Sequence, residues 1–167
     1  MLEVLVIFLI CSIIIVSFIS KKQELFLKVV GMYTVLAIFL MTIYLLLNFE
    51  YHINCLQYNF YLDLHYDVFN LNLAFGVDGF NLILIALSTF LILLCLIFNL
   101  QEKNLKFNLL NLLIIELSLV LVFSATDLFL FYFFFEIILI PMFLLIGVGG
   151  SRERKIRAGY LFFFIRL

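Results

Sequence analysis

The sequence predicts an all-α membrane protein: a bundle of five transmembrane helices with a partial sixth, and an extramembrane loop between the second and third helices. Two observations lead to this fold class. Hydrophobic residues make up 67% of the 167 residues and charged residues only 13%, and the mean hydropathy is +1.29. A soluble domain of this size does not need so much apolar surface, so the bilayer is its solvent.

The first half of the chain contains two apolar runs. Residues 2–19 form the first, and it lacks the basic start and the small-residue cleavage site of a signal peptide, so we expect a retained spanning helix. Lys21 and Lys22 follow it. Residues 25–47 form the second run, which is long enough to cross a bilayer with some tilt.

Residues 49–76 have a different character. In QYNFYLDLHYDVFNLNLAF, polar and apolar residues alternate. A period of two favours a strand or hairpin, which we expect outside the membrane. His52 and His65 lie in this stretch without ligand partners in register, so we interpret them as solvated loop histidines.

The second half contains three more runs and a short last piece. The third span, residues 80–100, follows Asp78, whose carboxylate we expect to cap the helix. The fourth, residues 109–125, turns sharply into the fifth, residues 128–148. The last piece, residues 158–167, would cover ~15 Å as a helix, about half of a span.

Charges predict the orientation. Basic residues follow the odd-numbered spans, hence lie on one side of the membrane: Lys21, Lys22, Lys28, Lys103, Lys106, Arg152, Arg154, Lys155 and Arg157. Residues 49–76 contain no Lys or Arg. The positive-inside rule therefore predicts that the basic loops face the matrix or cytoplasm, with the N-terminus and residues 49–76 on the other side. Arg166 is the one basic residue that does not follow this distribution.

Glu136 is the strongest candidate for chemistry. It interrupts the apolar run DLFLFYFFFEIILIP about nine residues after Asp127, or ~13 Å along a helix, near the centre of a bilayer. An ionised side chain there costs roughly 2.5–3.5 kcal/mol, so a function is the first hypothesis. Pro141 leaves the carbonyl of Ile137 without a helical donor, and we expect a buried carboxyl beside it. Tyr132, one turn earlier, is expected to pack rather than to donate a hydrogen bond to Glu136.

Glu116 is the second candidate. It lies ~12 Å along the fourth helix from Asn108, and the short turn before the fifth helix predicts that Glu116 and Glu136 lie at similar depth. Two carboxyls in an apolar interior disfavour each other's ionisation, which favours proton relay by the pair. The alternative is that both acids are protonated, hydrogen-bonded and structural.

The sequence offers no other chemistry. A net charge of −1 gives no support for a nucleic-acid partner. The cysteines have no metal-binding or redox spacing, and we expect Cys11 and Cys95 to be small buried thiols. Motifs for phosphate, haem or nucleophilic catalysis are lacking, so we expect neither a cofactor nor a metal in this chain.

Residues 108–160 resemble subunit 4 of respiratory NADH:ubiquinone oxidoreductase (complex I). The resemblance is carried by FFFEIILIPMFLLIG and GSRERKIRA, and FGVDGFNLILIALSTFLI at residues 75–92 resembles the start of that family's third helix. Residues 1–74 match only in arrangement, and the final FFFIRL departs from the pattern. The chain corresponds to about the first third of such a subunit.

The resemblance implies an antiporter-like, proton-translocating subunit. Glu136 and Glu116 match the family's fifth- and fourth-helix glutamates of the proposed proton path. The family also implies a role in an H⁺-translocating NADH:ubiquinone reductase of the mitochondrial inner membrane, with flavin, iron–sulfur clusters and quinone in other subunits.

Expected partners are the other membrane subunits of complex I, membrane lipids with cardiolipin as a candidate, and a second chain. That second chain would supply the missing helices, including the seventh-helix lysine that the family sets against its glutamate. Two alternatives remain at this point: a structural membrane scaffold without proton relay, and a subunit of a cation/proton antiporter.

Overall fold

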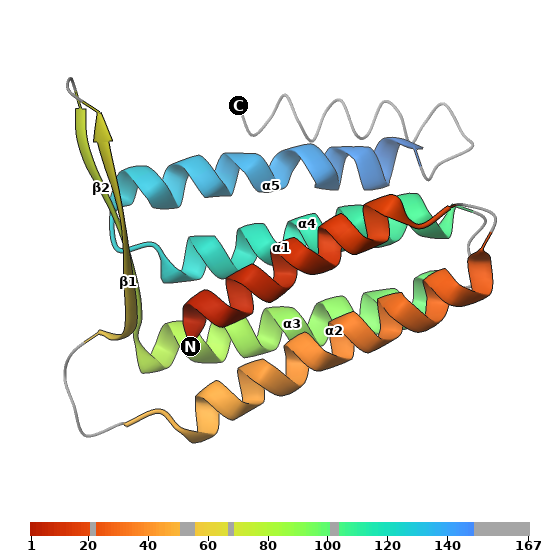
Figure 1. The fold of residues 1–167 in the computed structure, drawn as a ribbon, viewed down its shortest axis with the longest axis horizontal. Helices are drawn as coiled ribbons and strands as arrows, with labels where there is room; N and C mark the ends of the chain where they lie inside the picture. Colours follow the sequence, from red (N-terminus) through yellow and green to blue (C-terminus); the bar gives the residue numbers. More distant parts are fainter. Residues whose placement is uncertain (21–22, 51–55, 67–68, 101–103, 149–167) are drawn as a thin grey trace.

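Five helices and one β-hairpin build the part of the protein that the structure describes (Figure 1). The computed structural model describes residues 1–20, 23–50, 56–66, 69–100 and 104–148, with side chains described outside residues 61–73 and 147–148. The elements are α1 (Leu2–Phe18), α2 (Glu24–Leu47), β1 (Gln57–Tyr66), β2 (Phe69–Val77), α3 (Gly79–Asn99), α4 (Leu105–Ser124) and α5 (Leu128–Val148). The helices lie where the apolar runs predicted them, and the hairpin lies within the alternating stretch.

Four of the predicted membrane spans are supported among the described residues. Among the described residues, α2, α3, α4 and α5 are long and apolar enough to cross a bilayer, whereas α1 is a shorter apolar helix of 17 residues. At ~1.5 Å per residue α1 reaches only ~26 Å, less than a ~30 Å hydrocarbon core. Five spans are therefore not confirmed, and the predicted partial sixth at residues 158–167 lies outside the described residues.

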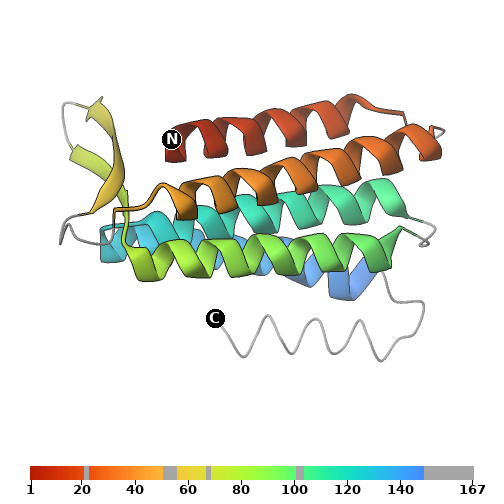
Figure 2. The same ribbon diagram turned by 90° about the horizontal axis from the view of Figure 1, so that it is seen from below.

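The helices run side by side, and the hairpin crosses one end of the bundle (Figures 1 and 2). Helices α1, α3 and α5 start at the hairpin end, while α2 and α4 start at the opposite end. The N-terminus thus lies near the hairpin. Lys28 and Lys106, near the starts of α2 and α4, belong to the opposite end, called the basic end below.

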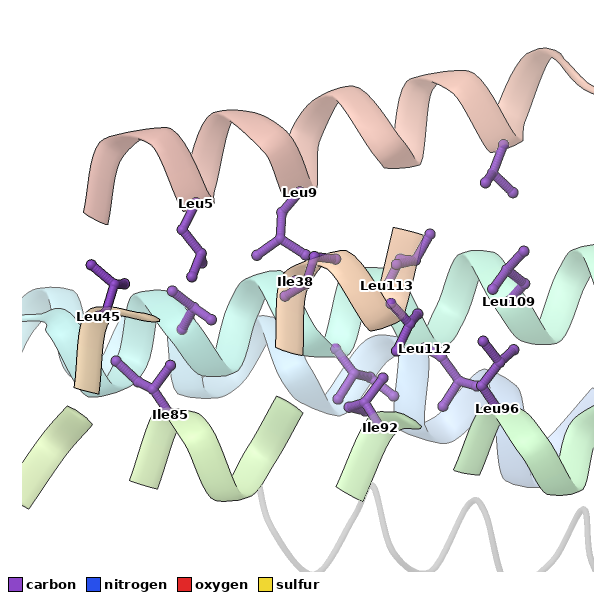
Figure 3. Packing of buried hydrophobic residues seen from close by; sticks show 14 of the residues in the cluster. Leu5, Leu9, Ile38, Leu45, Ile85, Ile92, Leu96, Leu109, Leu112 and Leu113 are labelled. Atoms are coloured by element: carbon purple, nitrogen blue, oxygen red, sulfur yellow. The ribbon is translucent and has the colours of Figure 1, made fainter. Parts of the chain in front are cut away.

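Helix α4 is the centre of the bundle. It packs against each of the other four helices, and 61% of its apolar window is buried, against 22–33% for α2, α3 and α5. Side chains from α1, α2, α3 and α4 point into a shared apolar interior, as Figure 3 shows. In a bilayer such an interior is held by close packing and hydrogen bonds rather than by exclusion of water.

Two contacts set the position of α4 against α1 and α2. The Lys106 ammonium donates to the carbonyls of Ser17 and Ile19 at the end of α1, at 2.7 Å each. Such carbonyls have no helical donor and lie at the negative end of the helix dipole, so a cation satisfies them. Leu109 packs so tightly on Gly31 of α2 that a Cβ there would lie 2.7 Å from Leu109 Cδ2.

Polar contacts also join α3 to its neighbours. Asn108 Nδ2 of α4 donates to Asn99 Oδ1 of α3 at 3.2 Å. Thr42 of α2 and Thr89 of α3 are fully buried, and their hydroxyl oxygens lie 3.1 Å apart. Each threonine thus gives the other a hydrogen-bond partner, which lipid tails could not supply.

The hairpin docks on the bundle through its base. The Thr126 hydroxyl, in the turn between α4 and α5, donates to the Ala74 carbonyl of β2 at 2.7 Å, and Phe75 pairs with Ala125 as an isolated bridge. The Tyr58 hydroxyl of β1 donates to the Leu45 carbonyl of α2 at 3.3 Å. Burial raises the pKa of Tyr58, and the neighbouring Tyr44 and Glu50 add to this effect.

Two smaller expectations are corrected. Asp78 does occupy the residue before α3, but its side chain makes no capping hydrogen bond; its main-chain carbonyl accepts from Leu82 at 2.9 Å. Cys11 and Cys95 are exposed on the outer surface of the bundle rather than buried. Neither helix position faces a neighbour, so an apolar run alone did not reveal which residues lie inside.

Candidate functional site

Glu116 is sealed inside the bundle. It lies in the middle of α4, its exposed fraction is 0%, and neither carboxylate oxygen has a hydrogen-bond partner among the described residues. Glu116 follows Leu109 by seven residues, which is two helical turns, so it lies on the face of α4 directed toward α2. A buried acid without a partner requires a proton or an internal water molecule, because an uncompensated charge there is strongly disfavoured.

Glu136 lies on the outer surface instead. The prediction of a buried carboxyl is wrong for the described part of the chain, because Glu136 is exposed. The reason is helix periodicity: α5 packs against α4 through its face containing Leu130, Ile138 and Pro141, which are buried, and Glu136 lies on the opposite side. The carbonyl of Ile137, which Pro141 leaves without a donor, lies on the α4 side and not beside the acid.

The two acids nevertheless share one level in the bundle. Glu116 precedes the end of α4 at Ser124 by eight residues, and Glu136 follows the start of α5 at Leu128 by eight, so each lies ~12 Å from the turn. The depth predicted from the short turn agrees with this geometry. The helix bodies lie between the two carboxyls, and Glu136 does not hydrogen-bond Glu116.

Tyr132 accompanies Glu136 on the outer face of α5. Its hydroxyl lies beside the Glu136 carboxylate, and its exposed fraction is 59%. The expected packing of Tyr132 is not seen among the described residues, where its side chain is exposed; the four-residue spacing places it and Glu136 on one face of α5. Apolar side chains surround this pair on the same face: Phe129, Phe133 and Ile140.

One functional candidate was missed from the sequence. Asn111 of α4 is 4% exposed, and its Nδ2 has no hydrogen-bond partner among the described residues. The signal was an amide within the apolar run LLNLLIIE. Asparagine is common in this chain, so the sequence did not single out Asn111, although a buried amide donor without a partner is costly.

Metal binding has no support in the part of the chain that the structure describes, which holds no group of three or more His, Cys, Asp or Glu residues close enough to share an ion. His52 and the side chain of His65 lie outside the described residues. The ionisable groups that the structure describes at this site are the enclosed acid Glu116 and the exposed acid Glu136.

Comparison with known proteins gives a consistent picture. Residues 125–167 match the family model described as "NADH:quinone oxidoreductase/Mrp antiporter, TM". The chain is 49% identical over 106 residues to NADH-ubiquinone oxidoreductase chain 4 of Chondrus crispus, covering 62% of this chain and 22% of that protein. It is 36% identical over 157 residues to chain 4 of Arabidopsis thaliana, covering 92% of this chain and 31% of that protein.

The fold also has a match among solved structures. A chain of "Respiratory complex I from Thermus thermophilus with bound NADH" superposes with a TM-score of 0.73 at 25% identity, covering 96% of this chain and 31% of that one. The resemblance to complex I subunit 4 is thus confirmed. The chain spans only about a fifth to a third of the relatives it matches.

Proposed function

We propose that this chain is the N-terminal portion of the antiporter-like subunit 4 of respiratory complex I, where Glu116 and Glu136 transfer protons within the membrane. The relatives are named as subunits of an NADH:ubiquinone oxidoreductase, and the proposal extends that activity to the assembly containing this chain. This chain performs no redox chemistry; flavin, iron–sulfur clusters and quinone belong to other subunits.

One observation carries the proposal: an enclosed acid with two unpartnered oxygens lies at the level of an acid exposed on the adjacent helix. Acids at membrane depth are costly and mark proton paths more often than they serve packing. Glu116 holds a proton in isolation. Glu136, with the Tyr132 hydroxyl beside it, exchanges protons with whatever group covers the outer face of α5.

The face of α5 around Glu136 requires a cover. An exposed carboxylate among Phe129, Phe133 and Ile140 is unfavourable in contact with lipid. We propose that helices carrying a cationic group, with lysine as the expected residue, cover this face and pair with Glu136. The expected second chain is one source of these helices, and a continuation of the same polypeptide is the other.

The location follows from the same family. We propose the mitochondrial inner membrane, with α1 also crossing it, the N-terminus and hairpin in the intermembrane space, and the basic end in the matrix. The N-terminus and hairpin do share one end of the bundle, opposite Lys28 and Lys106. Anionic lipids such as cardiolipin are proposed contacts of the basic loops.

The test replaces each acid by its neutral isostere in the assembled complex. We expect Glu116→Gln and Glu136→Gln to lower NADH-driven proton uptake into vesicles by roughly tenfold or more, because a glutamine cannot carry the proton. Proton uptake is followed with a pH-sensitive dye, and assembly is checked by native electrophoresis. Glu24→Gln, at the exposed start of α2, is the matched control and should pump normally.

Two alternatives predict different results. A structural scaffold would assemble and pump at the wild-type rate with both glutamines present, which would remove the relay role. A cation/proton antiporter subunit, which the second half of the family description allows, would exchange protons for Na⁺ or K⁺ without NADH. Measuring uptake with and without NADH, and with each cation, separates the three.

A further inference from the structure

A shallow groove lies on the outer surface of α2, in the half of the helix that belongs to the basic end. It has a volume of about 400 Å³, and one face of α2 lines it: Lys28, Val29, Met32, Tyr33 and Leu36. Val29, Tyr33 and Leu36 are exposed, so none of the other described helices covers this face. Lys28 is the one charged residue of the lining, and the other residues give the groove an apolar floor.

The Lys28 ammonium is available for an anion. It makes no hydrogen bond or ion pair with a described residue, although Glu24 lies one helical turn away. Lys106 differs, because its ammonium already donates to two carbonyls at the end of α1. Residues 21–28 contain three lysines and one glutamate, so Glu24 does not neutralise this stretch of the sequence.

Packing of α2 on α4 places Lys28 at the end of the bundle. Gly31 contacts Leu109, and each of them follows its lysine by three residues. Because α2 and α4 start at the same end (Figure 1), Lys28 and Lys106 lie at one level, beside the end of α1. Leu36 lies eight residues farther along α2, or ~12 Å toward the middle of the bundle. The groove therefore has a cation at its outer end and an apolar floor that runs inward.

This order of groups matches a phospholipid in the leaflet at the basic end. A phospholipid has its phosphate at the membrane surface and its acyl chains beneath, and a lysine at this level extends its ammonium toward the headgroups. Tyr33, ~7.5 Å inward from Lys28, has the amphipathic ring that is typical of the membrane interface. A protein partner would have to bring its own acid to Lys28, whereas the bilayer supplies anions at that level.

We propose that one anionic phospholipid binds this groove, with its phosphate on the Lys28 ammonium and an acyl chain along Val29 and Leu36. The ammonium donates hydrogen bonds to the phosphate oxygens. The net negative charge of the lipid sets it apart from phosphatidylcholine, whose own cationic group offsets the phosphate. The site lies on the helix α2 and not in the basic loops. It rests on the proposed membrane placement of the bundle and does not require proton transfer by the acids.

The test is photolabelling of the assembled complex in phosphatidylcholine bilayers. A minor fraction of the lipid carries a photoreactive acyl chain on either phosphatidylglycerol or phosphatidylcholine, and mass spectrometry of peptides locates the adducts. We expect the phosphatidylglycerol probe to label residues 29–36 several-fold more than the phosphatidylcholine probe. Lys28→Gln should lower phosphatidylglycerol labelling roughly fivefold, the factor expected for one lysine at an anionic surface. Lys28→Arg should retain it.

Two controls separate the site from general attraction of charged lipid. Glu24→Gln changes a neighbouring charge without removing the cation, so labelling of residues 29–36 should not fall. Leu47, which is 80% exposed at the other end of α2, is an internal reference that both probes should label equally in every variant.

Three results would overturn the proposal: equal labelling of residues 29–36 by the two probes, a preference that persists in Lys28→Gln, and protection of these residues from both probes by a protein. If Lys28→Gln fails to assemble, the wild-type comparison and Lys28→Arg still decide. A normal lipid preference with wild-type pumping in Glu116→Gln and Glu136→Gln would contradict only the proton relay. Absence of the preference, with pumping lost in both glutamine variants, would contradict only this site.

Discussion

At the scale of single residues, polar side chains in this protein satisfy main-chain groups that lipid cannot. Lys106 illustrates this, because one ammonium accounts for two carbonyls at the end of α1. These hydrogen bonds contribute more to stability than a solvated surface ion pair does, because they satisfy main-chain carbonyls that have no helical donor. Lys106 therefore contributes to holding α1 on α4, in addition to its contribution to the positive-inside pattern.

We expect Lys106→Met to loosen the end of α1. Methionine keeps the length and apolar stem of lysine but donates nothing to Ser17 and Ile19, and the lost hydrogen bonds correspond to about 1–2 kcal/mol of local opening free energy. Hydrogen exchange followed by mass spectrometry should show faster exchange in the last turn of α1. Lys28→Met, which removes a charge of the same end from α2, should leave that exchange unchanged; equal effects would contradict the contact.

At the scale of elements, α5 has two different faces. One packs on α4 through Leu130, Ile138 and Pro141, and the other exposes Glu136 and Tyr132 among aromatic residues. A helix that only faced lipid would not carry an acid there, because the charge has no compensation. We therefore expect the outer face to belong to an interface within a larger assembly.

A photo-crosslinking residue in place of Tyr132 tests this interface. We expect it to capture a protein segment of the assembly that contains a lysine, and mass spectrometry then shows whether the segment continues this chain or belongs to another. The same residue in place of Tyr33, which is 71% exposed on α2, should give mainly lipid adducts. Lipid adducts alone at position 132 would contradict the proposed cover.

At the scale of the whole molecule, the basic residues and the hairpin lie at opposite ends of the helix bundle. The hairpin and the N-terminus lie at one end, and Lys28 and Lys106 lie toward the other. Positive loops cross a membrane least readily, so this axis predicts how the bundle is inserted. The hairpin, tied to the bundle by Thr126 and Tyr58, follows the orientation of the helices.

We expect Asn59→Cys and Asn104→Cys to be labelled from opposite sides of the membrane. Both positions are exposed, one on the hairpin and one at the basic end, in a background with Cys11, Cys55 and Cys95 replaced by serine. A membrane-impermeant maleimide should reach position 59 from the intermembrane side of intact mitochondria stripped of their outer membrane, and position 104 only after the inner membrane is opened. The reverse pattern would invert the topology.

Much of the fold could be read from the sequence. Apolar runs and period-two alternation place the five helices and the hairpin, because side-chain periodicity is a local property. The same local reasoning, through the short turn at Thr126 and Asp127, predicted that Glu116 and Glu136 lie at similar depth. It could not show whether α1, with 17 residues, crosses the membrane.

Which side chains face inward was decided by the tertiary structure alone. In a soluble helix, polar residues mark the outer face, but in this chain both faces of each helix are apolar, so periodicity gives no direction. Packing around α4 enclosed Glu116 and Asn111 and left Glu136, Tyr132, Cys11 and Cys95 outside. The sequence by itself determined which residues are helical and that the two acids lie at one level along the bundle; only the packing of the other four described helices around α4 decided which acid is enclosed and which is exposed.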